Sequence, residues 1–137
     1  MPEEKKIRWT WLKIMYAYTL VGAGGFGLGI LLMPKLMIQM MGFPDQDPVT
    51  FGIAGSVFCA FALLSILGLR SPLKFAPVLL LSLSYKTIWL IAVIAPLLIS
   101  QRFPPYAGIL AFIFVTYIIG DLIAIPFHSV FAKEGGH

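Results

Sequence analysis

Charge is scarce in this sequence of 137 residues. Charged side chains make up 12% of the chain, against roughly 25% in ordinary soluble domains. The net charge of +4 is spread thinly and forms no basic stripe, which excludes nucleic acid as a partner. The single cysteine, Cys59, excludes an internal disulfide and every metal site built on several cysteines.

Residue types that carry catalysis are also rare. The chain has two histidines, and His137 lies outside every apolar stretch, so a pair of histidines cannot ligate haem within a membrane. Asp45 and Asp47 fall in a connection between apolar stretches and offer no paired acids for general acid–base chemistry. The sequence therefore predicts no metal, no cofactor and no catalytic residues, although an unusual membrane enzyme stays open as an alternative.

Apolar residues are what the sequence has in excess. They make up 59% of the chain, more than a soluble fold of this size can bury. Four apolar stretches are each long enough to cross ~30 Å of hydrocarbon as a helix. We expect them at about 11–33, 49–69, 76–100 and 107–131. The sequence thus predicts one all-α transmembrane domain, a four-helix antiparallel bundle surrounded by the lipid bilayer.

The connections between the spans contain signals that stop and start helices. Asp47 and Pro48 are typical of an N-cap followed by proline at the first helical position. The longest connection, 34–48, contains methionines at helical spacing. Part of it either lies flat on the membrane surface as a short helix or simply dips its methionines into lipid.

The positive charges are distributed unevenly between the two sides. With the N-terminus inside, the outer loops hold only Lys35 and Arg102, whereas the inner segments hold seven basic residues: Lys5, Lys6, Arg8, Lys13, Arg70, Lys74 and Lys133. Because positive residues favour the cytoplasmic side, we expect both termini to be cytoplasmic.

Two ionisable residues, Lys86 and Asp121, fall inside the third and fourth spans. An unpaired charge at the centre of a transmembrane helix costs about 2.5–3.5 kcal/mol on insertion scales. Each residue lies about 15 Å from the cytoplasmic boundary by helical rise, so antiparallel neighbours bring the two side chains to one level. We therefore predict a Lys86–Asp121 ion pair that faces the interior of the bundle.

Helical spacing places further polar or small residues near this pair. Ser82 and Trp89 share a helix face with Lys86, Tyr117 lies one turn before Asp121, and Gly22 falls at the same depth. This layer predicts an interior polar pocket. The pair can equally be structural, since it would fix which helices are neighbours.

Glycines are concentrated in the first span. Gly25 and Gly29 are separated by three residues, and Gly55 lies in the second span. Such spacing lets helix backbones approach closely. We expect it to serve packing of the first two helices, or an interface in a homo-oligomer or with another subunit of a membrane complex.

Several short segments carry a family resemblance. They are Met33-Pro34-Lys35-Leu36, Met41-Gly42-Phe43-Pro44, Ala54-Gly55-Ser56 and Gly68-Leu69-Arg70-Ser71-Pro72. In these segments and in its layout the chain resembles the small four-helix bacterial membrane proteins grouped as DoxX-like. The resemblance implies a multi-pass protein of the inner (plasma) membrane, often an accessory component.

The sequence leaves three classes of function open. The leading prediction is a non-enzymatic protein that is an accessory subunit or binds a lipophilic or amphipathic small molecule in its polar pocket. A small oligomeric transporter or channel is the first alternative. A membrane enzyme that acts on a lipid or quinone is the second.

Overall fold

The computed structural model describes residues 7–132, and this part of the chain is helical with no strand. Lys5, Lys6 and Lys133, on which the charge argument partly depends, lie outside the described residues. The elements in chain order are α1 (Trp9–Leu32), α2 (Pro34–Met41), α3 (Pro48–Arg70), α4 (Ala76–Trp89), a π-helical turn (Leu90–Ile94), α5 (Ala95–Ile99), α6 (Pro105–Ala124) and α7 (Phe127–Phe131).

Among residues 7–132 four helices are long and apolar enough to cross a membrane, as expected for a multi-pass helical protein. They are Trp9–Leu32, Pro48–Arg70, Ala76–Ile99 and Pro105–Ala124. The third contains the π-helical turn, in which the Ala95 N–H donates to the carbonyl of Leu90. Pro96 follows directly, and a proline disturbs the helical ladder because it lacks an N–H and its ring clashes with the preceding turn.

The fourth span ends earlier than the sequence predicts. We expected it to reach residue 131, but α6 ends at Ala124 and a separate short helix, α7, comes after it. Ile125 is extended, with φ −66° and ψ 126°. The reason is Pro126, which pushes the residue before it away from helical geometry.

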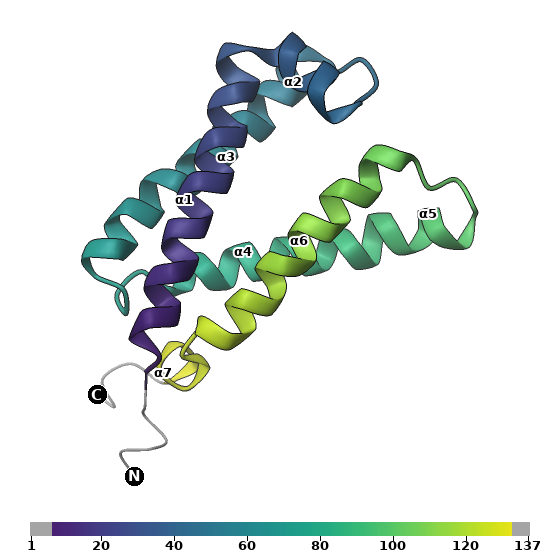
Figure 1. Cartoon of the computed structure of the whole chain (residues 1–137). Coiled ribbons are helices and arrows are strands. Elements are labelled where there is room, and N and C mark those ends of the chain that lie inside the picture. The colour runs from purple at the N-terminus through teal and green to yellow at the C-terminus, as the bar shows by residue number, and fades with distance from the viewer. Residues whose placement is uncertain (1–6, 133–137) are drawn as a thin grey trace.

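The helices form two pairs that diverge from each other (Figure 1). One pair consists of α1 and α3, which pack closely along their length, and the other consists of α4–α5 and α6. The arrangement is therefore more open than a bundle in which all four helices pack side by side along their length. The two pairs meet near the α3–α4 connection, where Tyr16 of α1 donates a 2.7 Å hydrogen bond to the carbonyl of Pro72.

Small residues allow α1 and α3 to pack, but the participants differ in part from those predicted. Gly55 packs against Ile30, and Gly27 faces Gly55 and Cys59 so closely that an added Cβ would lie 2.8 Å from backbone atoms of both. Gly29 is covered by Met37 of α2. Gly25 is exposed, and a Cβ there would meet nothing within 4 Å in residues 7–132. Gly25 therefore makes no close approach to α3, and its role at an interface with another copy or subunit stays a prediction.

The two ends of the structure are closed by different contacts. At the end where the pairs meet, Arg8 donates a 2.9 Å hydrogen bond to the carbonyl of Ile123, which joins the start of α1 to the end of α6. At the other end, part of the long connection forms the short helix α2, which is one of the two alternatives that the sequence leaves open. There the Phe43 ring packs edge-on against Tyr106 with 5.4 Å between ring centres, so the loop after α2 contacts the start of α6.

Candidate functional site

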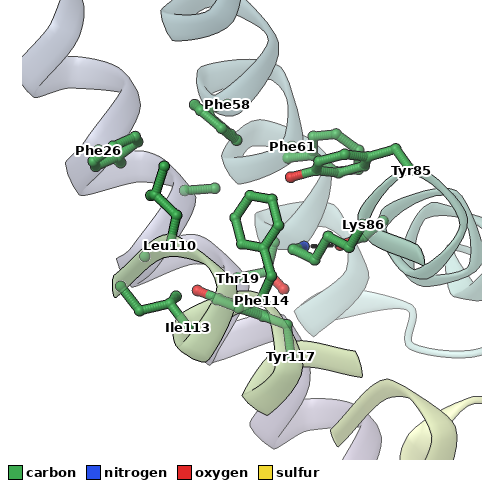
Figure 2. Close-up of a pocket in the computed structure, with 13 residues that line it drawn as sticks. Thr19, Phe26, Phe58, Phe61, Tyr85, Lys86, Leu110, Ile113, Phe114 and Tyr117 are labelled. Carbon is green, nitrogen blue, oxygen red and sulfur yellow. Dashed lines mark hydrogen bonds between the residues drawn. The ribbon is translucent and has the colours of Figure 1, made fainter. Parts of the chain in front are cut away.

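A cavity of about 80 Å³ lies between the two helix pairs, at the middle of the spans (Figure 2). All four spanning helices contribute to its wall. The lining residues are Thr19, Gly22, Ala23 and Phe26 of α1, Phe58 and Phe61 of α3, Ser82, Tyr85 and Lys86 of α4, and Leu110, Ile113, Phe114 and Tyr117 of α6. The wall is thus mostly aromatic and aliphatic, with one cationic side chain.

Lys86 places its ammonium group at the wall of this cavity. The residue is only 4% exposed, and its Nζ donates a hydrogen bond to the hydroxyl of Ser82, one turn earlier on α4. The ammonium also lies over three aromatic rings, at 4.4 Å from the centre of Tyr117, 4.8 Å from Tyr85 and 5.5 Å from Phe114. Because aromatic ring faces attract cations, these rings help to compensate the buried charge.

Asp121 is fully buried but does not line the cavity. It lies one turn beyond Tyr117 on the same face of α6. Neither of its carboxylate oxygens has a hydrogen-bond partner among residues 7–132. The carboxylate therefore receives no hydrogen bond from the Lys86 ammonium.

The predicted Lys86–Asp121 ion pair is thus not closed by a direct hydrogen bond. Both residues lie in the interior, as their depth predicts. The lysine side chain, however, points back along α4 to Ser82 and into the group of aromatic rings. The sequence indicates the depth of each charge, whereas the neighbouring rings determine where the ammonium settles.

Tyr117 connects α6 to α1 beside this charge. Its hydroxyl donates a 2.9 Å hydrogen bond to the carbonyl of Tyr18, and the Tyr117 and Tyr18 rings stack at 3.9 Å with 4° between their planes. Gly22 lies directly against Tyr117, where no side chain would fit. The pairing of Gly22 with Tyr117 holds one ring of the cavity wall in place.

Four of the six predicted polar-layer residues line the cavity: Gly22, Ser82, Lys86 and Tyr117. Trp89 does not line it, but its ring packs against Phe114, which does, with 4.9 Å between ring centres. Asp121 is buried but is not a lining residue. Four of the residues predicted for the polar layer thus lie around one cavity, whereas the side chains of Trp89 and Asp121 lie outside it.

Sequence reasoning missed two buried hydroxyls and most of the aromatic wall. Thr19 and Ser65 are almost fully buried, and their hydroxyl oxygens have no hydrogen-bond partner among the described residues. Phe26, Phe58 and Phe61 line the cavity although they resemble lipid-facing residues in the sequence. Nothing in the sequence distinguishes these positions, because a helix that is apolar all round carries no pattern that marks its inner face.

Comparisons with known proteins give no relative for this chain. No protein-family model matches it, and searches of curated proteins and of solved structures give no significant match. In residues 7–132 no cluster of three or more histidine, cysteine or acidic residues could hold a metal ion.

Proposed function

We propose that this protein is a non-enzymatic membrane protein that binds a lipophilic or amphipathic small molecule in the cavity between its helix pairs. The observation that carries the proposal is the wall itself. All four spanning helices contribute to it, and it is aromatic and aliphatic apart from the Lys86 ammonium and a few hydroxyls. Ligand sites typically combine an apolar wall with a small number of polar groups that fix orientation.

The position of the cavity supports a ligand that enters from lipid. The lining residues lie at the middle of each span, where the two helix pairs diverge (Figure 1). A hydrocarbon or aromatic part of the ligand would contact Phe26, Phe58 and Phe61, while a polar acceptor would meet the ammonium of Lys86.

Native mass spectrometry in mild detergent tests the proposal. The wild-type chain, extracted with its membrane lipids, should retain a bound lipophilic molecule. Ala23→Leu fills the cavity and should abolish retention, because Ala23 lines the wall. Ala17→Leu is the matched control, since Ala17 is exposed on the same helix. A bare wild-type chain, or equal retention by the Ala23 variant, would contradict the proposal.

We further propose that the protein lies in the inner (plasma) membrane with both termini in the cytoplasm, as the charge distribution and the DoxX-like resemblance suggest. The single cysteine makes this simple to test. In a Cys59→Ala background, Gln46→Cys and Ala132→Cys place one thiol at each end of the structure. An impermeant maleimide applied to intact cells should label only the Gln46 variant. Labelling of only the Ala132 variant would reverse the orientation.

The roles as accessory subunit, as oligomeric transporter and as lipid or quinone enzyme remain alternative proposals. Buried charges such as Lys86 and Asp121 favour the transporter among them, because ionisable residues within a membrane often mark an ion pathway. Flux through proteoliposomes distinguishes it. Absence of flux, or flux unchanged in Asp121→Asn, would exclude this role for the pair.

A further inference from the structure

The site contains one buried cation, Lys86, and one buried acid, Asp121. Lys86 lines the cavity and is accessible to a ligand, whereas Asp121, one turn beyond Tyr117 on α6, is buried and is not among the lining residues. In the described part of the chain these are the two buried residues among the lysines, arginines, aspartates and glutamates. An anionic ligand that binds the Lys86 ammonium would therefore compete with the Asp121 carboxylate for this one positive charge.

Nothing else around Asp121 replaces that compensation. The titratable side chains close enough to act electrostatically on Asp121 are Tyr16 of α1, Tyr85 and Lys86 of α4, and Tyr117 of α6. The hydroxyls of Tyr16 and Tyr117 donate elsewhere, to the carbonyls of Pro72 and Tyr18. The hydroxyl of Tyr85 points into the cavity (Figure 2). Both oxygens of Asp121 remain without a donor among residues 7–132.

The buried carboxylate of Asp121 is sensitive to the loss of its counter-charge. An ionised carboxylate without a partner is very costly in an apolar interior, and such a group becomes neutral instead. If an anionic ligand takes the Lys86 ammonium, the negative charge on Asp121 loses its nearest counter-charge. Uptake of one proton by Asp121 restores neutrality, since Lys86 then balances the ligand and Asp121 is uncharged.

On the basis of the proposed function, we propose that the ligand is a monoanionic amphiphile and that its binding is coupled to uptake of one proton at Asp121. The anionic head accepts hydrogen bonds from Lys86 and from the Tyr85 hydroxyl. Because the cavity measures only about 80 Å³, it holds the head and the first carbons of the tail against the phenylalanine wall, and the rest of the tail extends into lipid. Ligand anion and proton enter the site together, so the membrane interior gains no net charge.

Three probes of equal chain length test the ligand class: decyl sulfonate, decanol and decyltrimethylammonium. A sulfonate stays ionised across the working pH range, so any proton taken up must bind to the protein. We expect the sulfonate to bind at least tenfold more tightly than the other two. Equal binding of the neutral alcohol would overturn the inference but keep the proposed function, whereas no binding by any probe to the cavity would count against both.

Calorimetry of sulfonate binding in two buffers of different ionisation enthalpy counts the protons. Above the pH at which Asp121 ionises, we expect the wild type to take up about one proton per bound ligand. In the same pH range the affinity for the sulfonate should fall tenfold for each rise of one pH unit. Asp121→Asn, a neutral isostere, should bind the sulfonate with no proton uptake and with an affinity that does not change with pH. Asp45→Asn, an exposed acid in a connection, is the matched control and should behave as wild type.

A second experiment removes the positive charge of Lys86 and tests whether it binds the anionic head. Lys86→Gln should lower sulfonate affinity at least tenfold without affecting decanol, and Lys74→Gln, which removes an exposed charge before α4, should leave both unchanged. Sulfonate binding without proton uptake in the wild type, or with undiminished uptake in Asp121→Asn, would overturn the coupling.

Discussion

Gly22 of α1 lies directly against the phenol of Tyr117 in α6, and an added Cβ would overlap the hydroxyl and come within 3.1 Å of the ring carbon that bears it. The same hydroxyl donates to the carbonyl of Tyr18. The contact between the two helix pairs at the cavity therefore depends on the absence of a side chain at one position.

Gly22→Ala should destabilise the fold by about 1–3 kcal/mol, because overpacking forces Tyr117 away from its hydrogen bond. Thermal unfolding in detergent measures the effect. Gly25→Ala is the matched control, since that position is open, and it should be neutral or slightly stabilising by helix propensity. Tyr117→Phe removes the overlapping atom, so the double variant with Gly22→Ala should lose less than the sum of the single changes; strict additivity would show that the two residues do not clash.

Lys86 and Asp121 should be energetically coupled although no direct hydrogen bond joins them. Lys86→Met and Asp121→Leu should each destabilise the fold by about 3–5 kcal/mol, because each leaves one buried charge without compensation. The double change should recover part of this loss. A double-mutant cycle on unfolding free energies provides the measurement, and a coupling energy of zero would mean that the aromatic rings alone stabilise the ammonium.

Asp47 should make stability depend on pH at the start of α3. Its carboxylate accepts hydrogen bonds from the backbone N–H of Thr50 at 2.9 Å and from the Thr50 hydroxyl at 2.8 Å. These bonds, the backbone one above all, hold the pKa of Asp47 below its usual range. Its contribution is present above the pKa of the unfolded chain and is lost as the pH falls through the lowered pKa of the folded state.

Asp47→Asn keeps the cap but cannot titrate. The difference in thermal midpoint between wild type and this variant should therefore shrink upon acidification. Parallel curves for wild type and Asp47→Asn would show that the carboxylate charge does not contribute.

Pro126 should be the cause of the break between α6 and α7. Pro126→Ala should let the helix continue from Ala124 toward Phe131, because Ile125 is then free to adopt helical geometry. Amide hydrogen exchange of residues 125–128 should slow in the variant. Pro105→Ala, at the first position of α6 where a missing N–H costs nothing, should leave exchange unchanged. Unaltered exchange in the Pro126 variant would assign the break to tertiary contacts instead, such as Arg8 with Ile123.

The number of spanning helices and most of their ends could be predicted from the sequence, because these depend on local physics. A run of apolar residues must be about 20 long to cross the hydrocarbon. The start of α3 could be predicted from Asp47 and Pro48 because a cap bonds within its own turn. The overextended fourth span shows the limit of this reasoning, since the sequence alone does not tell whether Pro126 kinks a helix or ends it.

The positions of Lys86 and Asp121 along their helices could likewise be predicted from the sequence, because helical rise converts residue number into distance. The direction in which each side chain points could not. The ammonium is held by Ser82 and by the Tyr117 ring of another helix. In the same way, α1 turns Gly27 rather than Gly25 toward α3, and this depends on how the helix is rotated about its own axis. Helices that are apolar on every side carry no record of which face is turned inward, so the cavity and its aromatic wall exist only once the helices have packed.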